Sequence, residues 1–329
     1  MRRSFVFLAA ALLTGAALAA PPAFAEDGNE AFTIEDPRIT ESSGLAASRQ
    51  HPGVYWTHND QDEGAYLYAV DSRTGETVAT VTMTGVGAPR DVEAIALGPD
   101  DQLYVGDIGD NLGGTWDHVW VYRLPEPKRL RDQSVRATQY VVRYSDGARD
   151  AESLVVHPKT GRVYIIDKQE NGGHLYAGPA ELSPSGANVF EPVAPVDLWA
   201  TDAALSPNGE QLAVRGYFGG IAYDWNDGRI ERIGRLSVPF QGQGESVTYS
   251  ADGTKLMYGS EGLGSAVEPE DVPGGGGDAG SGRGAGSSSG NGSGAAGGDD
   301  DGFRPGPAAL GVAGLVAAVI GLLRLRRRR

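Results

Sequence analysis

Short runs in which apolar and polar residues alternate recur along this chain, with turns rich in Gly, Asp and Pro between them. Five of these runs open on a similar phrase, in which small or acidic residues lead into an aliphatic residue; the phrases cover residues 42–45, 91–95, 150–154, 201–205 and 244–247. Their closing aliphatic residues are Leu45, Ile95, Leu154, Leu205 and Val247, so successive phrases are 50, 59, 51 and 42 residues apart. A strand-built repeat of this length is typical of the blades of a β-propeller.

Further strands follow each phrase. Alternation, β-branched and aromatic residues and bounding turns predict second strands over 54–60, 103–107, 163–167, 212–215 and 256–261, and third and fourth strands in most units. The fifth unit lacks a final strand, whereas residues 32–35 form a spare strand near the start. We therefore predict an all-β chain with a single β-propeller over residues 32–267, which the N-terminal strand closes by pairing into the last unit. Five blades are expected; six are the alternative if the long unit between Ile95 and Leu154 contains extra strands.

The two ends of the chain have different compositions from the repeats. Arg2 and Arg3 precede an apolar run and a small-x-small motif at 23–25, which predicts a signal peptide over residues 1–25. Residues 268–302 are expected to be a disordered linker, because 14 of the 29 residues from 274 to 302 are Gly. The chain is uncharged and apolar over 307–323, which predicts a transmembrane helix over 303–323, and the Arg-rich tail over 324–329 follows it.

This tail predicts the orientation of the chain, since basic residues beside a membrane helix stay on the cytoplasmic side. We expect a single-pass protein at the extracellular face of the plasma membrane, with its C-terminus in the cytoplasm. Sortase substrates also end in an apolar segment and basic residues, but their Leu-Pro-x-Thr-Gly signal is missing here. Its absence favours a retained helix over covalent attachment to a cell wall.

The net charge of the chain between its two ends restricts the kinds of molecule that it can bind. All 43 acidic residues but only 20 of the 28 basic residues lie between 26 and 302, so this part of the chain carries a net charge of −23. A negative electrostatic field argues against nucleic acid as a partner. It is consistent with cationic partners, or with a charge that serves only to keep the protein in solution. The chain has no Cys, which excludes disulfides and thiol chemistry. We expect a monomer that binds an unknown extracellular ligand or protein.

The repeat phrases also predict a gathering of acids. In a blade the first strand lines the central channel and the second runs antiparallel to it, so the start of the first and the end of the second meet on one face. Glu93, Glu152 and Glu245 each lie two residues before the closing aliphatic, and Ser43 has this place in the first unit. Ala203 takes it in the fourth unit, beside Asp202.

Converging carboxylates must be protonated or neutralised by a cation. Oxygen ligands without Cys or a His cluster favour Ca²⁺, with Ser43, Glu93, Glu152 and Glu245 as its ligands. Nine further residues could support the site as a second layer: Asp60, Asp91, Asp107, Asp110, Asn111, Asp150, Asp167, Asp202 and Glu261. The alternative is that these acids bind turn amides, each within its own blade.

The Ser-Gly-Leu, Asp-x-Glu-x-Ile and Leu-Tyr-Val-Gly-Asp phrases, which recur over residues 40–265, resemble secreted bacterial β-propeller proteins grouped with WD40-like and esterase-like phytase repeats. The chain does not show a proper Gly-His…Trp-Asp signature of the kind that true WD40 repeats carry. A more distant likeness is to calcium-activated apyrases, which are five-bladed and bind a central calcium through Ser and Glu of their first strands. Ser43, Glu93, Glu152 and Glu245 follow that order, and Ala203 departs from it. The resemblance implies a calcium ion bound by these residues. It does not imply nucleotidase activity.

Two function classes follow. The first is a cell-surface binding module with a cation-stabilised acidic channel. The second is a metal-dependent hydrolase of phosphoesters or lactones that uses the same channel mouth. Motifs for serine hydrolases, zinc proteases and phosphate-binding loops are absent from the sequence. Few basic residues are placed to bind a phosphate; the candidates are Arg90, Arg149, Lys168 and Arg215. This scarcity favours binding, and whether the protein is an enzyme stays open.

Overall fold

We describe a computed structural model of the chain, over residues 28–60, 64–111 and 113–273. The chain divides into two compact units, 1–278 and 279–329, and the described residues all belong to the first. The expected signal peptide, transmembrane helix and Arg tail lie outside the described residues. Among the residues that are described, no helix is long and apolar enough to cross a membrane.

The described part is all-β, with one short 3₁₀ turn at Pro99–Asp101. Each repeat phrase forms a first strand: β2 (Ser42–Ala47), β6 (Val92–Leu97), β11 (Ala151–Val156), β15 (Ala200–Leu205) and β19 (Gly244–Tyr249). The second strands are β3 (Val54–Asn59), β7 (Gln102–Asp107), β12 (Val163–Asp167), β16 (Gln211–Gly216) and β20 (Lys255–Ser260). The third are β4 (Tyr66–Asp71), β8 (Val119–Pro125), β13 (Gly173–Ala177), β17 (Gly219–Asn226) and β21 (Ala266–Asp271).

The remaining strands are β1 (Phe32–Thr33), β5 (Thr77–Thr84), β9 (Gln133–Arg136), β10 (Thr138–Tyr144), β14 (Ala187–Val196) and β18 (Arg229–Leu236). Antiparallel pairing groups the strands into units in chain order: unit 1 (β2 to β5), unit 2 (β6, β7, β8 and β10), unit 3 (β11 to β14), unit 4 (β15 to β18) and unit 5 (β19, β20, β21 and β1). In unit 5, Phe32 of β1 pairs with Val267 of β21. The predicted closure by the N-terminal strand is therefore confirmed.

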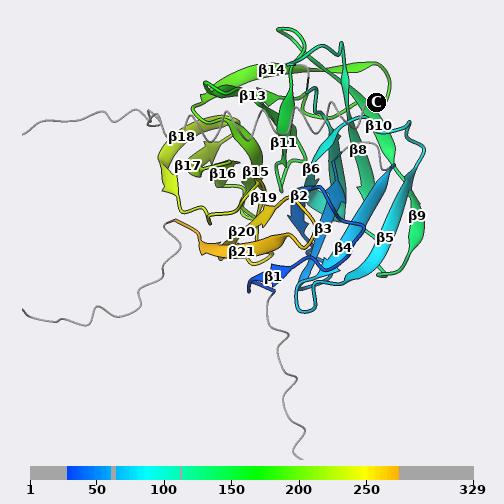
Figure 1. Cartoon of the computed structure of the whole chain (residues 1–329). Helices are drawn as coiled ribbons and strands as arrows, with labels where there is room; N and C mark the ends of the chain where they lie inside the picture. The colour runs from blue at the N-terminus through cyan, green and yellow to red at the C-terminus, as the bar shows by residue number, and fades with distance from the viewer. Residues whose placement is uncertain (1–27, 61–63, 112, 274–329) are drawn as a thin grey trace, which may run out of the picture. The chain divides into compact units, whose positions relative to one another are not determined.

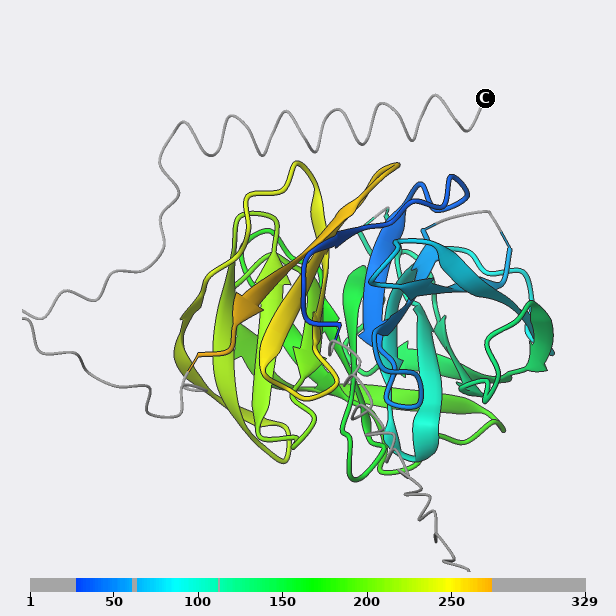
Figure 2. The ribbon, with the colours of Figure 1, turned by 90° about the horizontal axis from the view of Figure 1, so that it is seen from below.

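The first strands surround a common centre. Each contacts the first strand of the next unit, and β19 contacts β2, so the ring β2, β6, β11, β15 and β19 is closed. Figure 1 shows these five strands innermost, with the later strands of each unit outside them. The turned view in Figure 2 shows the sheets side by side around that centre. This arrangement is propeller-like, and we use the term channel for the axis that the five first strands surround.

Two parallel pairings connect neighbouring units at their outer strands. β10 pairs with β14, which joins units 2 and 3 into one eight-stranded sheet. β9 leaves unit 2 and pairs with β5 of unit 1. The long interval between Ile95 and Leu154 is thus used partly by β9, a strand that the sequence analysis did not predict.

Apolar side chains fill the space between units. One buried cluster joins Trp56 and Leu67 of unit 1 to Leu103 and Tyr122 of unit 2. Hairpin turns close the units, and the turn at Gly75 needs glycine for two reasons. Its φ is +72°, and a Cβ there would lie 1.9 Å from the carbonyl oxygen of Thr33. The turn between β4 and β5 therefore also packs directly against the backbone of β1.

The predicted start of the linker at residue 268 is wrong. β21 runs from Ala266 to Asp271, and its residues pair with β20 as far as Lys255 opposite Asp271. The composition of this segment is polar, but the hydrogen bonds of β20 extend the strand beyond the last apolar residue. The folded region therefore reaches at least Asp271.

Candidate functional site

A β-bulge begins the first strand of every unit. The register between first and second strands shifts at Glu93, Glu152 and Glu245, because the residues on either side pair with consecutive residues of the second strand. In unit 1 the shift spans Ser43 and Gly44. A bulge turns a side chain out of the regular alternation, which is how bulges often re-aim residues at functional sites. The predicted equal register of the three glutamates is therefore present, and it has a structural cause.

The fourth unit corrects one expectation. Its bulge lies between Ala200 and Asp202, so Thr201 occupies the place of the glutamates. Ala203 instead pairs two residues further along, at the place of the aliphatic residues. The error arose because the fourth phrase was aligned on Leu205. The bulge ring is Ser43, Glu93, Glu152, Thr201 and Glu245, which has an oxygen-bearing side chain in every unit.

Three carboxylates converge between units 1 and 2, at the end of the channel where the first strands begin. We call this end the mouth. One oxygen each of Asp60, Asp91 and Glu93 lies within 4.8 Å of the others. Their residues are 3%, 4% and 3% exposed. Asp60 follows the last residue of β3, Asp91 precedes β6, and Glu93 is the bulge residue of β6, so the group depends on the packing of one unit against the next.

The electrostatics of this group disfavour three bare negative charges. Burial raises the pKa of the Glu93 carboxyl well above its ordinary value, and the nearby charges of Asp60, Glu152 and Asp91 raise it further. Within the described part of the chain, Glu93 Oε1 is buried and accepts no hydrogen bond. A cation beside Oε1 would compensate for the burial. Ca²⁺ binds oxygen at 2.3–2.6 Å, so oxygens up to about 5 Å apart can share one ion.

The loop after β7 positions this group. Asn111 Nδ2 donates to Asp91 Oδ2 at 2.6 Å, and the backbone amide of Gly109 donates to the Asp91 carbonyl at 3.2 Å. Gly109 lies directly against the carboxylates, since a Cβ at this position would be 2.6 Å from Asp91 Oδ2 and 2.7 Å from Glu93 Oε1. The absence of a side chain at residue 109 therefore leaves room at the carboxylates.

We predict that a cation bound by Asp91 and Glu93 would lose at least about tenfold in affinity in Gly109→Ala, because the added methyl group must displace one of these carboxylates. Gly87→Ala is the matched control, since a Cβ there has nothing within 4 Å. Calorimetric titration with calcium measures both. Equal affinities for the two variants would show that the space beside Gly109 is not part of a cation site.

The other half of the mouth contains its own cation. Lys168 Nζ forms an ion pair with Glu152 and donates to the Tyr217 hydroxyl at 3.0 Å. Burial alone would lower the pKa of Lys168, but Glu152, Tyr217, Glu245 and Glu93 together raise it well above its ordinary value. Burial and the charge of Glu152 also raise the pKa of Glu245. Glu152 is thus paired with an ammonium group, which distinguishes it from Glu93.

Ser43 donates to the Glu41 carbonyl at 3.4 Å, so its hydroxyl has a local partner. Most of the predicted second layer accepts hydrogen bonds from backbone or side-chain donors, some within its own unit and some in the neighbouring unit. Asp107 accepts from the amide of Asp91 at 2.9 Å, and Asp167 accepts from that of His174 at 2.6 Å. Further contacts include Asp110 with the amide of Trp116 at 2.6 Å, Asp150 with the amide of Asp110 at 2.9 Å, Asp202 with the amides of Ala203 and Val247 at 2.8 Å each, and Glu261 with Gln243.

Sequence reasoning missed Tyr217 and Thr201 and named Lys168 only as a phosphate contact. A signal for Tyr217 and Lys168 exists in the register. Both directly follow a second strand, as do Asp60 and Glu261. Aligning the second strands by their last residue would have placed these side chains in one ring around the mouth.

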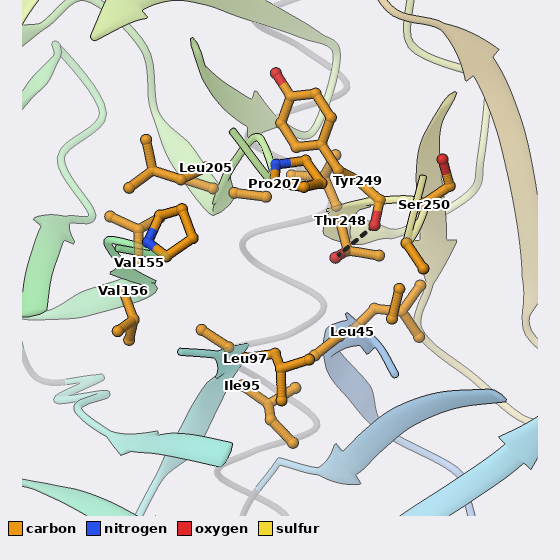
Figure 3. A pocket seen from close by; sticks show the side chains of 18 of the residues that line it. Leu45, Ile95, Leu97, Val155, Val156, Leu205, Pro207, Thr248, Tyr249 and Ser250 are labelled. Carbon is orange, nitrogen blue, oxygen red and sulfur yellow. Dashed lines mark hydrogen bonds between the residues drawn. The ribbon is translucent and has the colours of Figure 1, made fainter. Parts of the chain in front are cut away.

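The other end of the channel is apolar. A cavity of about 60 Å³ lies there, lined by the later residues of all five first strands. Figure 3 shows Leu45, Ile95, Leu97, Val155, Val156 and Leu205 around it, with Pro207 and Tyr249 at one side. Ligand sites usually enclose about 300–1,000 Å³. This end is therefore better explained as packing between strands than as a binding site.

Comparison with known proteins identifies no family: no family model matches the chain, and no curated protein matches it. Solved structures that resemble it include a protein proposed to be a 6-phosphogluconolactonase from Bacteroides uniformis, with a TM-score of 0.38, 15% identity and coverage of 66% of this chain and 64% of that one. The soluble aldose sugar dehydrogenase of Escherichia coli has a TM-score of 0.45 and 10% identity, over 72% and 98% of the two chains.

The WD40 repeats of RRP9 have a TM-score of 0.39 and 11% identity, over 73% and 98%. The chain thus spans just under two thirds of the length of the Bacteroides protein. These structural neighbours include WD40 repeat proteins, but the similarity is weak.

Proposed function

We propose that the protein is an extracellular binding module whose channel mouth binds one Ca²⁺ ion through Asp60, Asp91 and Glu93. The buried convergence of these carboxylates, one from unit 1 and two from unit 2, carries the proposal. All-oxygen ligands suit a hard cation. Asn111, which donates to Asp91, would orient that ligand from behind.

The proposal modifies the ligand set expected from the repeats. Glu93 is retained, and Asp60 and Asp91 move from the second layer to the ion. Glu152 is left to Lys168. Ser43, Thr201 and Glu245 then line the mouth beside the ion, where an external ligand would meet them.

The proposal includes the wider organisation expected from the sequence. Each of the units 1 to 5 is taken as one blade, and the eight-stranded sheet as two blades joined by the β10–β14 pairing. A cleaved signal peptide, a Gly-rich linker and a C-terminal membrane helix would display the monomeric propeller on the outer cell surface. The net charge of −23 over residues 26–302 supports a cation, not a polyanion, as the inorganic partner.

Calcium is expected to raise the melting temperature of the full chain by roughly 5–10 °C at a concentration about 100 times the dissociation constant, and a chelator to reverse this. Glu93→Gln should abolish the response without unfolding the protein, because it removes a ligand charge and keeps the side-chain volume. Glu152→Gln is the control that should retain the response, since Glu152 is bound to Lys168. Differential scanning calorimetry with and without calcium decides; melting that ignores both calcium and chelator contradicts the proposal.

A second candidate is a calcium-dependent hydrolase of phosphoesters or lactones. The observation that favours it is Lys168, a charged group in the same mouth that could attract a substrate oxyanion. A hydrolysis screen with phosphoesters and lactones, with and without calcium, tests this. Activity that is lost in the Glu93→Gln variant would establish the enzyme; a screen without turnover would leave the binding module as the proposal.

A further inference from the structure

Lys168 is a buried ammonium group in the mouth. Its side chain is 10% exposed, and the Glu152 carboxylate with which it pairs is 4% exposed. The Tyr217 hydroxyl of unit 4 accepts a hydrogen bond from the same Nζ at 3.0 Å. Lys168 therefore connects unit 3 to unit 4 across the mouth, and its charge is opposite to that of the three glutamates in the bulge ring.

The register of the repeats gives Lys168 a counterpart. Lys168 directly follows β12, as Asp60 directly follows β3. The backbone amide of each donates to the residue two before the bulge position, Lys168 to Asp150 and Asp60 to Glu41. Equivalent positions in a rotationally repeated fold have similar radius and height. At the position directly after the second strand, unit 1 thus has a carboxylate and unit 3 has an ammonium group.

The surroundings keep this ammonium group charged. The acids Glu152, Glu245 and Glu93 and the Tyr217 hydroxyl raise the pKa of Lys168, although burial opposes them. A lysine that acts as a nucleophile or a base needs a lowered pKa instead. Lys168 is therefore suited to a permanent electrostatic role. Its charge acts on Glu93, whose buried Oε1 has no hydrogen-bond donor among the described residues.

We infer that Lys168 is a tethered cation in a second cation position of the mouth, formed by Glu152, Glu245 and Tyr217, and that it limits the mouth to one exchangeable divalent ion. This inference rests on the proposed function only for the identity of the ion. It assigns Lys168 the role of a specificity-determining residue. A chain without this ammonium group would accept an additional divalent ion beside Glu152 and Glu245.

The test counts calcium ions. The full chain and its Lys168→Met variant are dialysed to equilibrium against calcium, and bound metal is measured by elemental analysis. We expect one ion per wild-type chain and two per Lys168→Met chain. Lys168→Arg keeps the charge and should stay at one ion. The double variant with Lys168→Met and Glu152→Gln should return to one, because a ligand of the new site is lost.

The outcomes separate this inference from the proposed function. If the wild type binds no ion and Lys168→Met binds one, the proposed calcium site is wrong and the tethered cation is supported. If the wild type binds one ion and Lys168→Met also binds one, the proposed function stands and the inference is overturned. If the wild type and Lys168→Met bind the same number of ions, whatever that number is, the inference is overturned as well.

Lys168→Met could impair folding, because Glu152 would lose its buried counter-charge. Circular dichroism melting with increasing calcium covers that case. A rise in melting temperature with calcium that is larger in Lys168→Met than in the wild type and in the double variant supports a cation position vacated by Lys168. A Lys168→Met chain that stays unfolded at millimolar calcium overturns the inference. Tyr217→Phe, which keeps the ammonium group, should behave as wild type in ion count.

Discussion

Replacing Arg215 by leucine is expected to lower the free energy of unfolding by about 3–5 kcal/mol. Arg215 is fully buried in β16, at the boundary between units 4 and 5. Its guanidinium donates to the carbonyls of Ser246 and Gly259, each at 2.7 Å, and to Gln241 Oε1 at 2.7 Å. Leucine can make none of these bonds, so buried acceptors of unit 5 would lose their donor.

The effect should be large because unit 5 closes the ring. Burial lowers the pKa of Arg215 to about 10, and the charges of Glu245 and Asp202 partly offset that fall. The guanidinium is thus charged at neutral pH, and its loss would also leave Asp202 buried without that favourable charge. The buried carboxyl of Asp202 in unit 4 accepts a hydrogen bond from the amide of Val247 in unit 5, so a second buried group also joins these two units.

Urea unfolding, followed by tryptophan fluorescence, measures the change in Arg215→Leu. Arg232→Leu is the control, because Arg232 is exposed on β18 and surface substitutions usually change stability by less than about 0.5 kcal/mol. If both variants lose similarly little stability, the buried guanidinium does not connect units 4 and 5 in solution.

Replacing Trp56 by alanine is expected to cost about 3–5 kcal/mol of unfolding free energy. Trp56 in β3 is fully buried in the cluster between units 1 and 2. Its indole Nε1 donates to Glu126 Oε1 at 2.7 Å, and Glu126 is itself 3% exposed. The substitution would therefore create a cavity and leave a buried carboxylate without this donor.

Trp56→Phe separates the two causes. Phenylalanine fills most of the space but cannot donate to Glu126, so its cost should be smaller, on the order of 1–3 kcal/mol for the lost hydrogen bond. Thermal melting of both variants, at the same calcium concentration, measures the difference. A Trp56→Ala chain as stable as Trp56→Phe would show that the packing of Trp56 contributes little at this boundary.

The sequence by itself determined the local elements. Alternation with a period of two residues and the turn residues between runs predicted the strands. The missing last strand of the fifth unit predicted that the N-terminal strand pairs into that unit, and Phe32 indeed pairs with Val267. The similar phrases also placed Glu93, Glu152 and Glu245 in equal register, which the bulges confirm. These features depend on residues that are close together in the sequence, so short segments of sequence are enough to predict them.

Only the tertiary structure decided which side chains meet. Which residue of a phrase becomes the bulge depends on its pairing with the second strand, and for this reason Thr201 and not Ala203 joins the ring. Asp60 reaches Asp91 and Glu93 through the contact between units 1 and 2, and Lys168 reaches Tyr217 through that between units 3 and 4. Such contacts arise between segments far apart in sequence, so the gathering of three carboxylates at one boundary and the pairing of a lysine with a tyrosine at another could not be read from the repeats.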